Sequence, residues 1–132
     1  MVESSGINKH EIRGRLMTES KWITSTNRLV PTDVWATAIN EGVTRFIVAI
    51  WIPGDLKNTV RTEILKKEED SSYTTKWCPI PVAPADFRQI PKGAYSVEDP
   101  ILRLAGGCNL AACMDTTGSS INITVAYWDS DV

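Results

Sequence analysis

The sequence predicts an all-β protein, an antiparallel β-sandwich of jelly-roll type in a single domain. Short apolar segments recur along the chain, turn residues separate them, and none has the spacing of an amphipathic helix. The clearest segment is 121–128, where every second residue from Ile121 to Tyr127 is large and apolar. This period of two is typical of a strand with one buried face. An eight-stranded jelly roll fits a chain of 132 residues.

The last third of the chain, 101–128, predicts three short strands in a meander with turns at Gly106-Gly107 and Thr117-Gly118-Ser119. Earlier strands are expected at 11–22, 34–39, 43–52, 59–65 and 71–77, with a turn at 25–27. Segment 43–52 is apolar on both sides, with Phe46 predicted to face the same way as Ile50. It is therefore expected to be a central strand.

Charged and proline-rich segments separate these strands. Lys66 to Asp70 predicts a solvated hairpin tip, and 71–77 is expected to pair back beside 59–65. Five of the seven prolines lie between residues 79 and 100. Because proline lacks an amide donor, we expect a long irregular crossing there, with one short turn at 83–89 and an edge strand near 94–97.

Length and charge predict one domain without a nucleic-acid or membrane partner. Residues 1–20 are expected to form an N-terminal arm and first strand, and 21–132 the sandwich domain. A net charge of −2, from 14 basic and 16 acidic residues, does not fit a uniformly basic nucleic-acid binder. The longest apolar run, Phe46 to Pro53, has eight residues, and the first residues lack the pattern of a signal peptide. We therefore expect synthesis in the cytoplasm.

The residues that carry common enzyme chemistry are sparse, so we predict a protein that is not an enzyme and has no cofactor. The single histidine, His10, lies in the polar arm, away from any expected strand. Cys78, Cys108 and Cys113 are expected to be buried free thiols, because three cysteines suit neither a disulfide framework nor a zinc site with four ligands.

Two weaker alternatives involve carboxylates. Asp129 and Asp131, with Asp115 nearby, could bind a hard cation such as calcium, but tail carboxylates more often face water. Paired carboxylates for glycoside hydrolysis remain open as well, although no pair is selected by its sequence context. We predict no metal site.

Five tryptophans suggest a binding surface of some kind. If they are exposed on one face, they would suit a carbohydrate-binding module; otherwise they fill the core or an assembly interface, where aromatic residues are enriched. Strand positions favour the second interpretation for three of them. The tryptophans are Trp22, Trp35, Trp51, Trp77 and Trp128.

Over roughly residues 30–128 the chain resembles small β-sandwich structural proteins of tailed bacteriophages. The motifs that carry the resemblance are Ala36 to Trp51, Ile90-Pro-Lys-Gly93, Ile101-Leu-Arg-Leu-Ala-Gly-Gly107, Leu110-Ala-Ala-Cys-Met114, Thr117-Gly118 and Ile121-Asn-Ile-Thr-Val-Ala-Tyr127. The chain departs from the pattern at Gly107, where many members place an acidic residue. The resemblance implies a role in the virion and no catalytic residues.

The resulting hypothesis is a non-enzymatic virion protein, first of all a capsid decoration or cement protein that bridges neighbouring capsid subunits. Alternatives are a neck, tail or fibre-base protein, a small jelly-roll coat protein, and a carbohydrate-binding module. The expected partners are the major capsid protein or other virion proteins, and a homo-oligomer, guessed to be a trimer. The residues expected to contact partners are His10, Arg13, Arg15, Trp22, Trp77, Pro81, Pro84 and Phe87.

Overall fold

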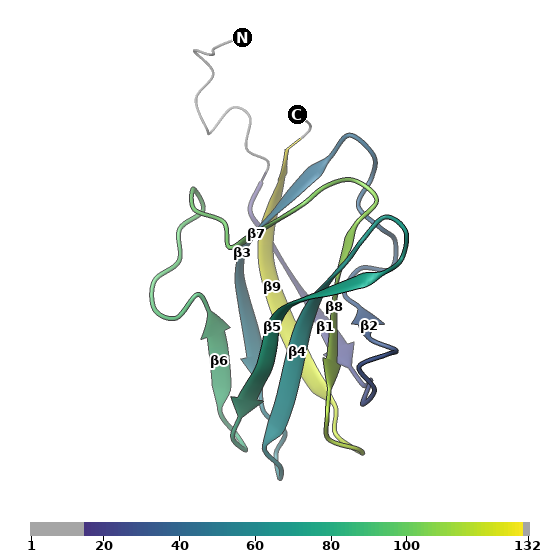
Figure 1. Cartoon of the computed structure of the whole chain (residues 1–132). Coiled ribbons are helices and arrows are strands. Elements are labelled where there is room, and N and C mark those ends of the chain that lie inside the picture. The colour runs from purple at the N-terminus through teal and green to yellow at the C-terminus, as the bar shows by residue number, and fades with distance from the viewer. Residues whose placement is uncertain (1–14, 131–132) are drawn as a thin grey trace.

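The computed structural model describes residues 15–130, which form nine strands in two antiparallel sheets that pack face to face (Figure 1). The strands are β1 (Met17–Ile23), β2 (Thr32–Asp33), β3 (Thr44–Pro53), β4 (Val60–Lys67), β5 (Tyr73–Val82), β6 (Phe87–Ile90), β7 (Leu102–Leu104), β8 (Asn109–Met114) and β9 (Ile121–Ser130).

The strand order confirms the predicted jelly-roll-like sandwich. The five-stranded sheet has the order β1-β9-β3-β6, with β7 also on β3, and the four-stranded sheet has the order β2-β8-β4-β5. Strands from the start of the chain thus pair with strands from its end: β1 with β9, β2 with β8, β3 with β6 and β7, and β4 with β5. These nested pairs make one long antiparallel hairpin that is rolled into a sandwich.

β6 and β7 share one position in the five-stranded sheet. Both run antiparallel to β3, with Ile90 opposite Ile50 and Leu102 opposite Ile47. Residues 91–101 leave the sheet between these two short strands and return to it. They lie against its outer face, because the carbonyl of Val97 accepts a hydrogen bond from Trp128 Nε1 at 3.0 Å.

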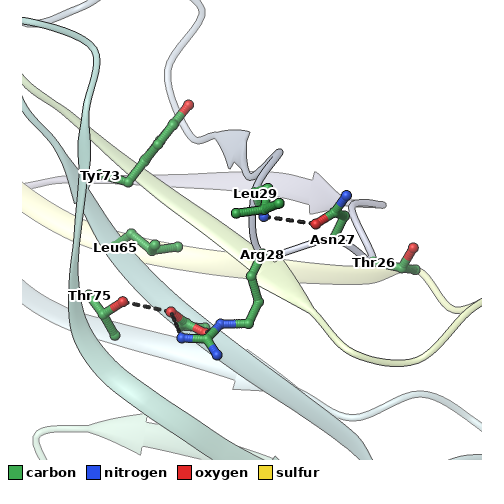
Figure 2. Close-up of a pocket in the computed structure, with 8 residues that line it drawn as sticks. Thr26, Asn27, Arg28, Leu29, Leu65, Tyr73 and Thr75 are labelled. Carbon is green, nitrogen blue, oxygen red and sulfur yellow. Dashed lines mark hydrogen bonds and ion pairs between the residues drawn. The ribbon is translucent and has the colours of Figure 1, made fainter.

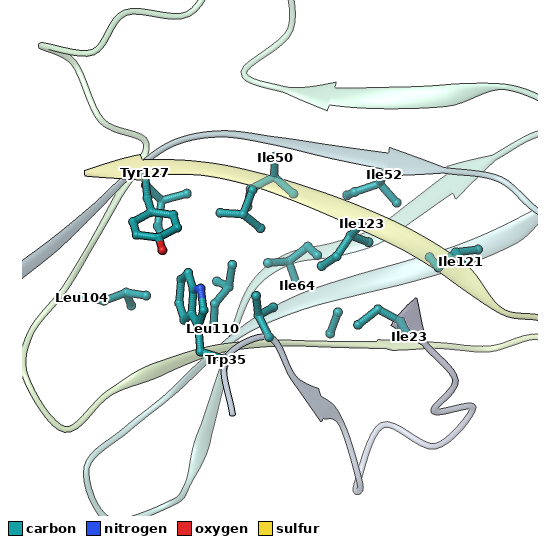
Figure 3. Close-up of a cluster of buried hydrophobic side chains, with 14 of the residues drawn as sticks. Ile23, Trp35, Ile50, Ile52, Ile64, Leu104, Leu110, Ile121, Ile123 and Tyr127 are labelled. Atoms are coloured by element: carbon teal, nitrogen blue, oxygen red, sulfur yellow. The ribbon is translucent and has the colours of Figure 1, made fainter. Parts of the chain in front are cut away.

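The core lies between the two sheets, where inward-facing isoleucines of β3 and β9 meet side chains of β4 and β8 (Figure 3). Trp35 and Tyr127 meet edge to face in it, with ring centroids 5.3 Å apart. Burying one large apolar side chain of this kind contributes about 1.5–3 kcal/mol, so this layer supplies most of the favourable free energy. The alternation predicted for 121–127 is confirmed, since all four large residues belong to the core.

A β-bulge in β3 corrects the predicted facing of that strand. The register with β9 shifts between Ile47 and Ala49, so the inward residues are Ile47, Ile50 and Ile52. Phe46, predicted to face the same way as Ile50, lies instead on the outer face and stacks on Trp128 at a centroid distance of 4.1 Å. A strict period of two cannot anticipate one inserted residue.

The predicted strand at 34–39 is wrong, because this segment is a series of bends beside β8. Val34 N–H donates to the Leu110 carbonyl of β8 and Ile39 N–H to the Cys108 carbonyl just before β8, and between them Asn109 takes the place of a strand neighbour. Its amide Oδ1 accepts from Trp35 N–H at 3.3 Å and its Nδ2 donates to the Trp35 carbonyl at 3.0 Å. The side chain of Asn109 thereby satisfies buried backbone groups that a regular ladder would satisfy.

The expected meander over 101–128 is also wrong, although all three strands exist. β8 lies in the four-stranded sheet, whereas β7 and β9 lie in the five-stranded sheet and each pairs with β3, so no two of the three pair with each other. Periodicity in the sequence predicts where a strand lies, but the strand with which it pairs is determined by segments that are distant in the sequence. At the start of the described chain, the strand predicted at 11–22 is shorter, because β1 begins at Met17. The turn predicted at 25–27 lies slightly later, where Val30 N–H donates to the Asn27 carbonyl.

The proline-rich segment is more regular than expected. β5 continues to Val82 although it contains two prolines. They are tolerated because β5 is an edge strand, so the amides on one side of its backbone need no partner strand. The edge strand expected at 94–97 lies instead at Phe87–Ile90, and the short turn beside it involves 84–85. The β4–β5 hairpin, with its charged tip, is confirmed.

Candidate interaction site

The structure separates the residues predicted to contact partners into two groups at opposite edges of the sandwich, and two of them, His10 and Arg13, lie outside the described residues. Figure 1 shows β6 at one edge and β2 at the other. Arg15 lies just before β1 and Trp22 lies within it. The second group lies along β5, β6 and their connection and consists of Trp77, Pro81, Pro84 and Phe87.

The β1 edge presents apolar side chains to solvent. Trp22 is 60% exposed, and Leu16 and Met17 are also exposed large hydrophobic residues. Trp22 lies opposite Asn122 of β9, on the outer face of the sheet, so it does not contribute to the core. Such a side chain is more typical of a contact surface than of a packing role.

A groove of about 460 Å³ lies between the edge strands β5 and β6. Trp77 and Ile80 are half-buried and pack against the core, while Phe87 is 59% exposed. Arg88 and Lys92 add positive charge. The groove is lined by Trp77, Ile80, Phe87, Arg88, Gln89, Ile90, Lys92 and Gly93. Of the predicted contact residues, the structure therefore brings Trp77 and Phe87 together here, and Pro81 and Pro84 are exposed nearby without lining the groove.

A second, more polar pocket of about 600 Å³ lies on the outer face of the four-stranded sheet, under the segment between β1 and β2 (Figure 2). Figure 2 shows Arg28 reaching from this segment toward the sheet. The pocket is lined by Thr26, Asn27, Arg28, Leu29, Glu63, Leu65, Tyr73 and Thr75.

The carboxylate of Glu63 is the most buried charge of this pocket, with its side chain only 7% exposed. Arg28 Nε lies 2.7 Å from Glu63 Oε2, and Thr75 Oγ1 donates to Oε1 at 2.6 Å. Burial raises the pKa of Glu63, but hydrogen bonds from Thr75, Cys78 and Arg28 outweigh burial and lower the pKa overall. The carboxylate is therefore ionised at neutral pH and does not suit general-acid chemistry.

A second polar cluster borders the pocket at the other end of β4. Lys67 Nζ lies 2.8 Å from Asp33 Oδ2, and the Tyr73 hydroxyl donates to Asp33 Oδ1 at 3.1 Å. Burial, with the adjacent Asp33 carboxylate, raises the pKa of Tyr73, so the phenol remains a hydrogen-bond donor at neutral pH. The pocket thus combines an aromatic ring with fixed donors and acceptors.

The residues considered for metal binding have other partners. Arg45 holds Asp129 through two hydrogen bonds of 2.7 and 2.9 Å, and Asp115 pairs with Arg61, whereas Asp131 lies outside the described residues. Across residues 15–130, no three His, Cys, Asp or Glu side chains gather in a way that could hold a metal ion.

The cysteines are free, as predicted, but Cys78 is exposed, which corrects the expectation that all three are buried. Cys108 and Cys113 are buried. Burial raises the pKa of Cys113 to about 11, so its thiol stays protonated at neutral pH and is a poor nucleophile.

Sequence reasoning missed the polar pocket entirely. Arg28 and Glu63 are 35 residues apart, and no local pattern connects them. The only available signal is the alternation within 59–65, which sets Glu63 on the same side of the strand as Arg61. That alternation could not show that a distant loop folds over this face.

Comparisons with known proteins add no relative: the chain matches no protein-family model, no curated protein and no solved structure. Within the described part of the chain, no helix is long and apolar enough to cross a membrane.

Proposed function

We propose that this chain is a non-enzymatic virion structural protein, first of all a capsid decoration protein that bridges neighbouring capsid subunits. The jelly-roll strand order supports this, because capsid proteins use this architecture. Lectins and enzymes of the cupin class use it too, so the fold alone does not select the function.

The observation that carries the proposal is the distribution of exposed aromatic side chains. A bridging protein needs two separate contact surfaces, and Trp22 and Phe87 are exposed at opposite edges of the sandwich. Interface hot spots are enriched in large aromatic residues that become buried in the complex. The rigid sandwich between the two edges would hold these anchors at a fixed separation.

A binding assay with capsids of the virus that encodes the chain, prepared without it, tests the proposal. The labelled chain is sedimented with these capsids, and the bound fraction is measured over a range of concentrations. We expect Trp22→Ala and Phe87→Ala each to weaken binding about tenfold. Glu41→Gln, an exposed change in the loop between β2 and β3, is the control and should bind like the wild type. A chain that does not sediment with capsids contradicts the proposal.

The same preparation separates a decoration protein from a small jelly-roll coat protein, or from a neck, tail or fibre-base component. A decoration protein attaches to shells that are already closed. A coat protein is the shell itself, so particles do not form without it. Electron microscopy of the capsids prepared without the chain, and of the positions it occupies when added back, distinguishes these roles.

The pocket in Figure 2 favours one other function, the binding of a glycan. The tryptophans do not form a sugar-binding platform, because only Trp22 among the five is largely exposed. The polar pocket, however, is lined by the Tyr73 ring together with Glu63 and Arg28, which offer fixed acceptors and donors to sugar hydroxyls. A glycan array compares the wild type with Tyr73→Ala; binding that this change abolishes would support the glycan function over the virion role.

A further inference from the structure

Strand β1 leaves one side of its backbone open. It pairs along its whole length, Met17–Ile23, with β9, and no other described strand lies on its second side. An open edge of seven residues is a template for another strand, and stable proteins usually block it with proline, a bulge, a covering loop or charged side chains that find no partner on an incoming strand. β1 contains no proline, and its register with β9 is regular throughout.

Neither charged side chain of β1 forms an ion pair within residues 15–130. Glu19 and Lys21 lie two positions apart, on the same side of the strand as Ile23. Glu19 instead accepts a hydrogen bond of 2.9 Å from the neutral hydroxyl of Tyr127.

We propose that two copies of this chain pair through β1, antiparallel and about a two-fold axis that passes Ser20. In this arrangement Glu19 of each copy lies directly opposite Lys21 of the other, which makes two ion pairs across the axis. Opposite charges at directly facing positions stabilise antiparallel strands. The result is one continuous sheet across both copies.

The symmetry makes this register the favoured one. Facing residues of an antiparallel pair point to the same side, so a two-fold axis has to pass a residue and not a peptide between residues. An axis at Glu19 sets two carboxylates opposite each other, and an axis at Lys21 sets two ammonium groups opposite each other. An axis at Thr18 brings Lys21 opposite Arg15. An axis at Met17 sets Glu19 opposite Arg15 but leaves most of β1 facing residues that precede the strand. Only the axis at Ser20 pairs all seven residues of β1 with β1 of the other copy and also sets opposite charges face to face.

The same register covers exposed apolar surface. On the outer face, Trp22 of one copy lies opposite Thr18 of the other and diagonal to its Leu16, within reach of a large side chain. On the inner face, Met17 lies opposite Ile23. The pairing therefore buries Trp22, Leu16 and Met17, which are exposed in the single chain. The pairing does not depend on the virion role. Because it covers the β1 edge, a paired copy would meet a capsid subunit through its Phe87 edge, and the dimer itself would present two such edges. The pairing predicts a two-fold contact in place of the guessed trimer.

Cysteine cross-linking tests the position of the axis. Ser20 of the two copies would face each other at the axis, whereas the two Thr18 side chains would be separated by several residues. Both positions are exposed, which makes them a matched pair. In a Cys78→Ser background, which removes the exposed native thiol, Ser20→Cys and Thr18→Cys are treated with diamide, which takes up the two thiol hydrogens. We expect covalent dimers for Ser20→Cys alone.

Charge reversal tests the ion pairs without disturbing the bond between Tyr127 and Glu19. Lys21→Glu sets carboxylates opposite each other on both sides of the axis, so we expect the dimer dissociation constant to rise about tenfold or more in sedimentation velocity. Lys57→Glu, the same reversal at an exposed site away from β1, is the control and should dimerise like the wild type. Equal cross-linking at positions 18 and 20, or a Lys21→Glu dimer as tight as the wild type, would overturn the proposal.

Discussion

The two sheets share one core but hold their outer faces by different interactions. On the five-stranded sheet the outer face is aromatic: Phe46 stacks on Trp128, and Trp51 meets Tyr95 edge to face at 5.6 Å. On the four-stranded sheet it is polar, with a buried carboxylate held by a loop arginine. The comparison teaches that the inner faces determine the fold, whereas each outer face depends on the segment that crosses it.

In both sheets the covering segment is irregular chain. Residues 91–101 bring Tyr95 and Val97 onto the aromatic face, and the segment between β1 and β2 brings Arg28 onto the polar one. Apolar contact has no charge that titrates with pH or that dissolved ions screen, whereas an ion pair depends on both. Mutations on the two outer faces should therefore cause losses of stability that differ in magnitude and in pH dependence.

The largest effect is expected on the aromatic face. Trp128→Ala removes the stack on Phe46 and the hydrogen bond to the Val97 carbonyl, and it leaves a cavity. We expect the free energy of unfolding to fall by about 3–5 kcal/mol, measured by urea denaturation. Trp128→Phe keeps a ring for the stack and should recover more than half of the loss. A loss below about 1 kcal/mol for Trp128→Ala would contradict the packing seen at this face.

A smaller effect is expected on the polar face. Arg28→Met keeps much of the side chain but leaves Glu63 without its charged partner, and an unpaired buried carboxylate is unfavourable. We expect the melting temperature to fall by roughly 5–10 °C. Arg61→Met is the matched control: its partner Asp115 is 46% exposed and can be hydrated, so the shift should stay under about 2 °C. Equal shifts in the two variants would show that burial of Glu63 is unimportant.

The polar face should also respond to acid. Because the pKa of Glu63 is lowered in the folded protein, its ionised form stabilises the fold above the unfolded pKa of about 4.3, and this contribution is lost as the pH falls through the folded pKa. Glu63→Gln cannot titrate. We therefore expect the stability advantage of the wild type over Glu63→Gln to shrink between pH 7 and pH 3 in urea denaturation. Parallel pH curves for the two proteins would exclude this contribution.

These differences explain how much of the fold the sequence could predict. The inner face of β9 was predictable because alternation between 121 and 127 is a local property. The bulge beside Ile47 and the bends at 34–39 were not predictable, because each depends on a neighbour distant in the sequence. Asn109 replaces a strand partner for Trp35 across 74 residues, and no local pattern records that.

The candidate site was predictable only in part. Exposed aromatic residues such as Trp22 and Phe87 could be proposed from composition and position, and both are exposed in the structure. Their contact with a partner stays a prediction. The pairing of Arg28 with Glu63 required the loop to be placed first, so sequence reasoning could not reach it.

The smallest effect on stability is expected at Trp22, which belongs to neither outer-face network. The residue is 60% exposed and belongs to no core cluster, so Trp22→Ala should change the free energy of unfolding by no more than about 0.5 kcal/mol in urea denaturation. The same variant is expected to lose affinity for capsids and for a second copy. A residue whose loss weakens binding but hardly changes stability belongs to a contact surface. If Trp22→Ala instead lowered the free energy of unfolding by several kcal/mol, Trp22 would be a structural residue and neither proposal could rely on it.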